Sequence, residues 1–142
     1  MKKLIITPAL FAAIAFAACG QKLDASKVPV AVKASFAKQY PGAAAKWEKE
    51  DGKYEATFKQ GANELSAMFD PNGSFSESEM EMKVTDLPAT VADYMKAHYK
   101  GKSIKGAAKI TRADGSINYE AALGSKDVIF DANGNFLKEV KD

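Results

Sequence analysis

One pattern occurs twice in this chain and sets the strongest constraint on its fold: FDPNGSF at residues 69–75 and FDANGNF at residues 130–136. Upstream of these strings, VPVAVKASFAKQYPG (residues 28–42) aligns with LPATVADYMKAHYKG (residues 87–101) at an offset of 59 residues. The offset at the FDxNGxF strings is 61 residues, so the second copy contains small insertions between its helix segment and its FDxNGxF string. Segments that keep their order and spacing over about 50 residues indicate an internal duplication of one supersecondary unit.

Each copy is predicted to open with a helix. Pro29 and Pro88 suit a first helical turn, where a missing N–H group removes no intrahelical hydrogen bond. Behind each proline, apolar side chains recur at every fourth position, which is the spacing of one helical stripe. The stripes consist of Val32, Phe36 and Tyr40 in the first copy and of Val91, Met95 and Tyr99 in the second. Gly42 and Gly101 are typical of the residue that follows a helix end.

Strands are predicted to follow each helix. The Asp-Gly pair at residues 51–52 signals a two-residue hairpin turn, and counting outward from it places Trp47 on the same face as Tyr54. The side chains expected on this inward face are Trp47, Tyr54, Ala56, Phe58, Leu65, Ala67 and Phe69, and then Ile110, Tyr119, Ala121, Leu123, Val128, Phe130 and Phe136. The expected fold class is therefore α+β, with two tandem repeats at residues 28–84 and 85–142. Each repeat is a helix followed by a four-stranded antiparallel meander sheet.

The FDxNGxF string itself fits a tight turn between two strands, because its aspartate starts such a turn and its glycine takes a positive φ angle. A calcium loop of the EF-hand type is the alternative. That loop needs glycine at its sixth position and a bidentate glutamate at its twelfth. Counting from Asp70 puts the glycine at position four, and counting from Asp131 ends the chain at position twelve with Asp142. We therefore expect turns, with no metal site and no cofactor.

The first nineteen residues, MKKLIITPALFAAIAFAAC, have the layout of a secretory signal. Two lysines precede an apolar run (residues 4–18) that is short for a membrane span and ends in small residues. Two cleavage sites compete. Ordinary signal peptidase would recognise AFA at residues 15–17, whereas FAAC at residues 16–19 resembles a bacterial lipobox, in which Cys19 is lipidated.

We favour the lipobox because Cys19 is the only cysteine in the chain, so it has no intramolecular disulfide partner. This interpretation predicts a signal peptide at residues 1–18 and a lipidated cysteine with a polar tether at residues 19–27. The protein would then be a lipoprotein of the bacterial cell envelope, periplasmic or at the surface, held at the membrane by its anchor.

Charge argues against a nucleic-acid partner. Without Lys2 and Lys3, which belong to the predicted signal, the chain has 18 basic and 18 acidic side chains. A neutral chain lacks the electrostatic attraction on which bulk nucleic-acid binding depends. The basic stretch at residues 96–112 either attracts an anionic partner or, as we favour, places lysines on a helix end and on an edge strand.

These motifs resemble those of the PepSY-like family of bacterial envelope proteins. The resemblance rests on VP…V…F…YPGA (residues 28–43), W…DGKYEATF (residues 47–58) and FDPNG (residues 69–73), with a weaker second set that ends in FDANG (residues 130–134). Lys100 departs from it, because proline follows the helix tyrosine in the first copy. The resemblance implies a fold similar to that of beta-lactamase inhibitory protein. It implies no single function, because the family has no uniform biochemical role.

No residue pattern matches a catalytic site. The only histidine, His98, is expected near the end of the second helix, where imidazoles are usually solvated or paired with the helix dipole. Zinc signatures need several histidine or cysteine ligands. Glu77, Glu79 and Glu81 alternate along one strand, and we interpret them as a solvated face. The protein is therefore expected not to be an enzyme.

The remaining candidate surface is the sheet face turned away from the helices. Alternation along the strands places six candidate partner-binding residues there: Glu55, Thr57, Met68, Asn118, Glu120 and Ile129. A half-apolar face bordered by charges suits a protein or peptide partner, unless neighbouring strands or loops cover it. The leading hypothesis is a non-catalytic envelope lipoprotein that binds a protein or peptide, and the resemblance adds inhibition of a secreted enzyme. The alternative is a periplasmic small-ligand carrier or sensor with a cleft between the repeats.

Overall fold

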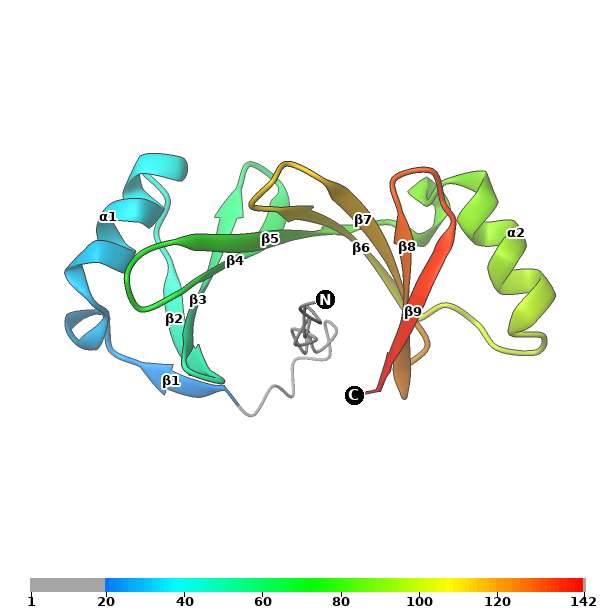
Figure 1. Ribbon diagram of the computed structural model, residues 1–142, viewed down its shortest axis with the longest axis horizontal. Coiled ribbons are helices and arrows are strands. Elements are labelled where there is room, and N and C mark those ends of the chain that lie inside the picture. Colours follow the sequence, from blue (N-terminus) through cyan, green and yellow to red (C-terminus); the bar gives the residue numbers. More distant parts are fainter. Residues whose placement is uncertain (1–19, 142) are drawn as a thin grey trace, which may run out of the picture.

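The computed structural model describes residues 20–141, which form one arched antiparallel sheet with two helices on its outer side (Figure 1). The helices are α1 (Val30–Gln39) and α2 (Ala89–His98), preceded by the short 3-10 helices η1 (Ala25–Lys27) and η2 (Val84–Asp86). The strands are β1 (Gln21–Leu23), β2 (Lys46–Glu50), β3 (Lys53–Gln60), β4 (Asn63–Phe69), β5 (Phe75–Met82), β6 (Gly106–Arg112), β7 (Ile117–Ala122), β8 (Lys126–Asp131) and β9 (Phe136–Lys141). Their order in the sheet is their order in the chain.

The predicted fold class, two repeats that each have a four-stranded sheet of their own, is wrong. β5 pairs with β4 on one side and with β6 on the other, so that Met80 faces Leu65 in one register and Lys109 in the other. All nine strands therefore belong to one sheet. The physical reason is that a separate fourth strand would leave a row of unpaired N–H and C=O groups at its edge, and pairing with β6 satisfies them. The boundary between residues 84 and 85 stays a prediction.

The segment expected to be a polar tether contains a strand. β1 pairs with β2, with Leu23 opposite Trp47. At the offset of 59 residues, Leu23 aligns with Met82 at the end of β5, which lies opposite Ala107 of β6. β1 is thus the counterpart of the last part of β5, and each helix is preceded as well as followed by a strand of the sheet.

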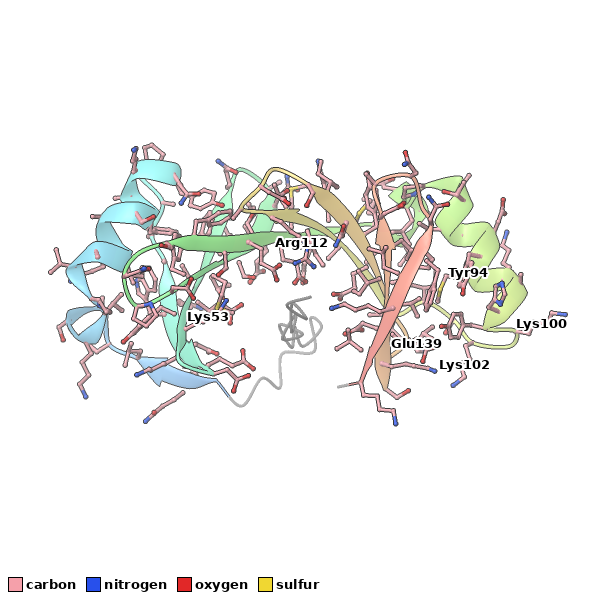
Figure 2. The ribbon with its side chains drawn as sticks, in the orientation of Figure 1. Lys53, Tyr94, Lys100, Lys102, Arg112 and Glu139 are labelled. Atoms are coloured by element: carbon pink, nitrogen blue, oxygen red, sulfur yellow. The ribbon has the colours of Figure 1, made fainter. Side chains whose placement is uncertain are left out.

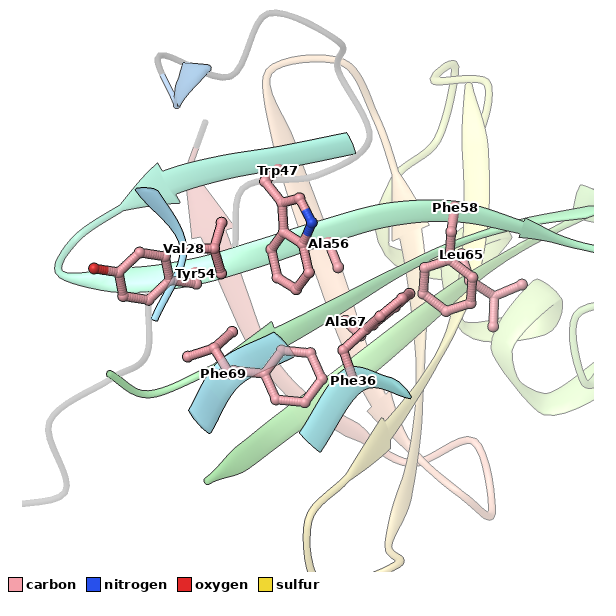
Figure 3. Packing of buried hydrophobic residues seen from close by; sticks show 10 residues of the cluster. Val28, Phe36, Trp47, Tyr54, Ala56, Phe58, Leu65, Ala67 and Phe69 are labelled. Atoms are coloured by element: carbon pink, nitrogen blue, oxygen red, sulfur yellow. The ribbon is translucent and has the colours of Figure 1, made fainter. Parts of the chain in front are cut away.

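Two apolar cores lie between the sheet and the helices. The first joins Val32 and Phe36 of α1 to the inward side chains of β2, β3 and β4, and its rings meet around Phe36 (Figure 3). Trp47 and Tyr54 lie on this face, as the hairpin count predicted. The second core joins Val91 and Met95 of α2 to the inward side chains of β6, β7 and β8.

The turn interpretation of both FDxNGxF strings is confirmed. In each, the glycine has a positive φ angle, 88° at Gly73 and 82° at Gly134, and its N–H donates to the carbonyl of the leading aspartate. Each glycine also lies against a helix start. A Cβ on Gly73 would stand 2.6 Å from the Ala31 carbonyl oxygen, and one on Gly134 would overlap Thr90 Oγ1. The motif therefore recurs because it makes a hairpin turn that also docks onto the helix of its own half.

The predicted signal peptide (residues 1–18) and Cys19 lie outside the described residues. Within residues 20–141, neither helix has the length and apolar character that crossing a membrane requires.

Candidate partner-binding face

The sheet side opposite the helices, here called the concave face, carries all six predicted partner-binding residues. Three rows of register partners cross it. They are Glu48, Glu55, Met68, Glu77 and Arg112; Thr57, Ser66, Glu79, Ile110 and Asn118; and Glu81, Ala108, Glu120, Ile129 and Lys138. Side chains directly opposite each other in such rows have Cβ atoms about 4.5–5.5 Å apart. The six predicted residues lie on β3 and β4 and on β7 and β8, and β5 and β6 lie between these two groups.

Exposure of this face differs from the sequence expectation. Glu55 and Thr57 are half-buried. Met68 is 6% exposed, Ile129 is 3% exposed, and Asn118 and Glu120 are also buried. The expectation that these four face solvent is wrong, because the sheet is arched and side chains on the inner side of an arch crowd together (Figure 1). The binding role of the six residues stays a prediction.

The centre of the face belongs to residues that sequence reasoning assigned elsewhere. Glu77 and Glu79 are buried, so their interpretation as a solvated face is wrong, whereas Glu81 is exposed as expected. Ile110 was expected on the helix side, but it lies opposite Glu79 on the concave face. β6 was expected to be an edge strand and is instead paired on both sides. The one available signal was the run of alternating glutamates, which does not reveal that its strand is central.

Arg112 connects the two central strands to β7. Its guanidinium lies 3.3 Å from a carboxylate oxygen of Glu77. With the Asn118 amide oriented to satisfy its neighbours, its oxygen accepts from Arg112 Nε at 3.1 Å and its nitrogen donates to the Ile117 carbonyl. Burial raises the pKa of Glu77 and outweighs the opposing attraction of Arg112. Figure 2 shows Arg112 and Lys53 on the inner side of the arch, with Lys100 and Lys102 far from them beside α2.

Glu79 is the most perturbed acid of the face. Desolvation by burial raises its pKa to about 8, and the nearby charges of Glu55, Glu77 and Asp127 add to the shift. Its Oε1 atom is buried and has no hydrogen-bond partner. Burial also raises the pKa of the neighbouring Glu55, although a hydrogen bond with Ser66 opposes that shift. The middle of the concave face is thus buried and acidic, and Oε1 of Glu79 makes no hydrogen bond there.

The other chemical candidates lie away from this centre. His98 is exposed and stacks on Tyr94 of the same helix, with ring centroids 4.1 Å apart. Lys53 is engaged at one corner of the sheet, 2.9 Å from Ser76 Oγ and 3.5 Å from Asp70 Oδ1. From residue 20 to residue 141, no group of three or more histidine, cysteine or acidic side chains has a geometry that could hold a metal ion.

Comparison with protein families gives a match over most of the chain. The family described as "Putative beta-lactamase-inhibitor-like, PepSY-like" matches residues 17–76 and residues 52–138. No curated protein matches the chain.

Solved structures from Bacteroides share the fold. One from Bacteroides eggerthii, described as a "putative periplasmic" protein, is 16% identical with a TM-score of 0.68, over 80% of this chain and 88% of that one. A DUF2874 family protein from Bacteroides ovatus is 19% identical with a TM-score of 0.67, over 80% and 86%. A BLIP-like protein from Bacteroides fragilis is 24% identical with a TM-score of 0.62, over 78% and 84%. These similarities establish a BLIP-like fold.

Proposed function

We propose, from the premise that the chain belongs to the PepSY-like, beta-lactamase-inhibitor-like family, that it is a non-catalytic protein of the bacterial cell envelope. In this proposal it binds a protein or peptide partner on the concave face of its sheet. The observation that carries the proposal is the concave face itself, which combines apolar side chains with buried acids on the side of the sheet away from both helices.

The composition of the face supports binding of a folded or extended polypeptide. Met68, Ile110 and Ile129 lie beneath the middle of this face, where only 3–6% of each is exposed, and Glu55 and Glu79 lie beside them. Protein interfaces typically have an apolar centre with charged groups that select the partner. A curved sheet provides a broad surface for this purpose, and its rigid strands hold the contacting side chains in place.

The location in the envelope rests on two further observations. The N-terminal sequence has the layout of a signal that ends in a lipobox. A solved structure with the same fold is described as a "putative periplasmic" protein. Inhibition of a secreted enzyme is the sharper version of the proposal, suggested by the family description and by the BLIP-like structure from Bacteroides fragilis.

Site-specific photo-crosslinking in the producing cell tests the binding face. A photoreactive residue at Thr57 or Glu81, both on the concave face, should give discrete adducts with a second polypeptide. The matched control is Lys38, which is exposed on α1. Adducts that form equally well from Lys38, or none from either concave position, would contradict the proposal.

The anchor has its own test. Cys19→Ala should abolish labelling with a radioactive fatty acid and release the protein from the membrane fraction. If the variant fractionates like the parent protein, the lipoprotein part of the proposal is wrong, and cleavage by ordinary signal peptidase is favoured instead.

A further inference from the structure

We infer that the partner presents a lysine or arginine side chain to Glu79 at the centre of the concave face. This inference rests on the proposed function and gives the chemistry of the partner at one point of the contact.

Glu79 lies on β5, the central strand of the nine, with Ser66 of β4 and Ile110 of β6 as its register partners. Its side chain is 7% exposed, and its Oε1 atom has no hydrogen-bond partner. A buried carboxyl oxygen without a partner costs free energy, which a donor from outside would recover. Glu81, two residues further along the same face of β5, is exposed, so the face opens to solvent next to Glu79.

The charge around Glu79 is negative. The acids whose charges act on it are Glu55 of β3, Glu77 and Glu81 of β5 and Asp127 of β8. The cations of this face are Lys53, Arg112 and Lys138. Lys53 contacts Asp70 and Ser76, Arg112 is engaged by Glu77 and Asn118, and Lys138 lies on β9, four strands away from β5. A positive charge delivered by a partner would therefore meet several acids at once, and low-dielectric surroundings strengthen each attraction.

The surface beside Glu79 suits a long cationic side chain better than a bare ion. Glu79 is recessed, because Ile110 and Ala108 of the neighbouring strand β6 are 3% and 0% exposed and close it in on that side. Within residues 20–141, no set of acids has the geometry of a metal site. A recessed acceptor beside the exposed Glu81 fits an ammonium or guanidinium group on a long aliphatic stem, which can reach past Glu81 while its methylene groups stay partly buried.

Proton binding gives the inference a specific signature. Burial and the neighbouring acids raise the pKa of Glu79 to about 8, which favours the protonated carboxyl group in the free protein. A cation beside it favours the carboxylate and lowers that pKa, so binding must release a proton. The affinity of the partner for the protein should consequently rise as the pH rises from about 6 towards 8. A contact that needs the protonated acid would instead weaken over this pH range.

The test uses a displayed library of random twelve-residue peptides, selected against the full protein. Selected peptides are synthesised and titrated by calorimetry at pH 7 in two buffers of different ionisation enthalpy, which reports protons released. We expect the selected peptides to contain lysine or arginine and to release close to one proton when they bind the parent protein. They should bind Glu79→Gln at least tenfold more weakly than they bind the parent protein. Asp93→Asn, which removes one negative charge from the exposed side of α2, should bind within twofold of the parent.

The outcomes separate this inference from the proposed function. Peptides that crosslink from Thr57 or Glu81 but are indifferent to Glu79→Gln, or that carry no cation, overturn the inference and leave the binding face standing. Peptides that bind without crosslinking from either position overturn both. Circular dichroism of Glu79→Gln shows whether that variant is folded, and we expect it to be, because glutamine has the same shape and no charge to bury.

Discussion

Phe36 of α1 contacts four aromatic rings, whereas Met95, at the aligned position of α2, belongs to a core in which Phe130 is the only fully buried aromatic side chain among the described residues. The ring centroids of Tyr40, Trp47, Phe58 and Phe69 lie between 5.0 and 6.3 Å from that of Phe36. In the second half, Ala107 takes the place opposite the preceding strand that Trp47 has in the first. The same topology is therefore filled by an aromatic cluster in one half and by smaller side chains in the other.

Two aromatic side chains of the second half, Tyr94 and Phe136, lie at the flank of its helix. Tyr94 stacks between His98 and Phe136, with centroid distances of 4.1 and 5.3 Å, and Phe136 is 40% exposed. At the aligned positions of the first helix, Gln39 donates a hydrogen bond to Ser35. The two copies thus keep the same backbone pairing, although several bulky side chains lie beneath the helix in the first copy and beside the helix in the second.

The largest expected effect comes from removing the centre of the aromatic cluster. Phe36→Ala should lower the free energy of unfolding by about 3–5 kcal/mol, and Met95→Ala by about 2–5 kcal/mol, because each empties a buried site. We expect Phe36→Ala to be the more severe, since ring contacts add to the area lost. Urea denaturation followed by circular dichroism measures both. Val30→Ala, at a 78% exposed position of α1, is the control and should change stability by less than about 0.5 kcal/mol.

The same experiment examines whether the halves are independent. β5 pairs with strands of both halves, so each variant should unfold in one cooperative transition. Two separated transitions in Phe36→Ala would contradict a single cooperative sheet and favour two units that unfold separately.

Local sequence patterns predicted the turns and most of the inward side chains of both halves. They did not predict the features that depend on sheet curvature and strand order. The turn at residues 51–52 follows from its Asp-Gly pair, and the inward position of Trp47 follows from period-two alternation, so both depend on local sequence. The pairing of β5 with β4 and with β6 involves residues far apart in the sequence, and the residues of β5 alone do not predict it. Glu79 is buried because β5 is paired on both sides. The sequence could not reveal this, because alternating glutamates have the same pattern on a solvated strand and on a central one.

The second half also showed where pattern counting fails. The analogy with the first copy predicted an inward position for Ile110. The register places Ala107 and Lys109 on the helix side and Ile110 on the other. A one-residue error of this kind reverses the face of every side chain in a strand.

The next expected effect concerns the two turn glycines. Gly73→Ala and Gly134→Ala both place a side chain at positive φ, which costs about 1–3 kcal/mol. Both should cost more than positive φ alone, because the Cβ of Gly73→Ala would stand 2.6 Å from the Ala31 carbonyl oxygen and that of Gly134→Ala would stand 2.8 Å from Thr90 Cβ, an atom that rotation of the threonine side chain does not move. Thermal denaturation should therefore place both variants below Gly42→Ala in stability.

Gly42→Ala provides the control for this pair. Its φ angle is 77°, but a Cβ there would have no neighbour within 4 Å, so it reports backbone strain alone. If Gly42→Ala is as destabilising as Gly73→Ala, contact between turn and helix contributes nothing, and the docking explanation of the repeated motif is wrong.

A smaller effect is expected at the flank of α2. Tyr94→Ala should cost about 1–3 kcal/mol, because Tyr94 contacts both Phe130 and Phe136 and is half-buried. Ser35→Ala, at the aligned position of α1, should stay within about 0.5 kcal/mol of the parent. Equal losses from the two variants would show that the flank aromatics are not a stabilising feature of the second half alone.

The smallest effect separates the two aspartates that start the repeated turns. Asp131 accepts hydrogen bonds from the backbone N–H groups of Asn133 and Asn135 and from the Asn135 amide, and these bonds lower its pKa. In the first copy Asn72 performs part of this role by accepting from the Ser74 N–H, while Asp70 pairs with Lys53. Asp131→Ala should therefore lower the melting temperature by a few degrees, and Asp70→Ala by less. The Asp131 contribution is present above the ordinary aspartate pKa and is lost as the pH falls through the lowered one, so the difference between the variants should vanish in strong acid. Added calcium should change none of these melting temperatures. If calcium raised the melting temperature of the parent protein and Asp131→Ala removed that rise, the motif would be a calcium site and the turn interpretation would be wrong.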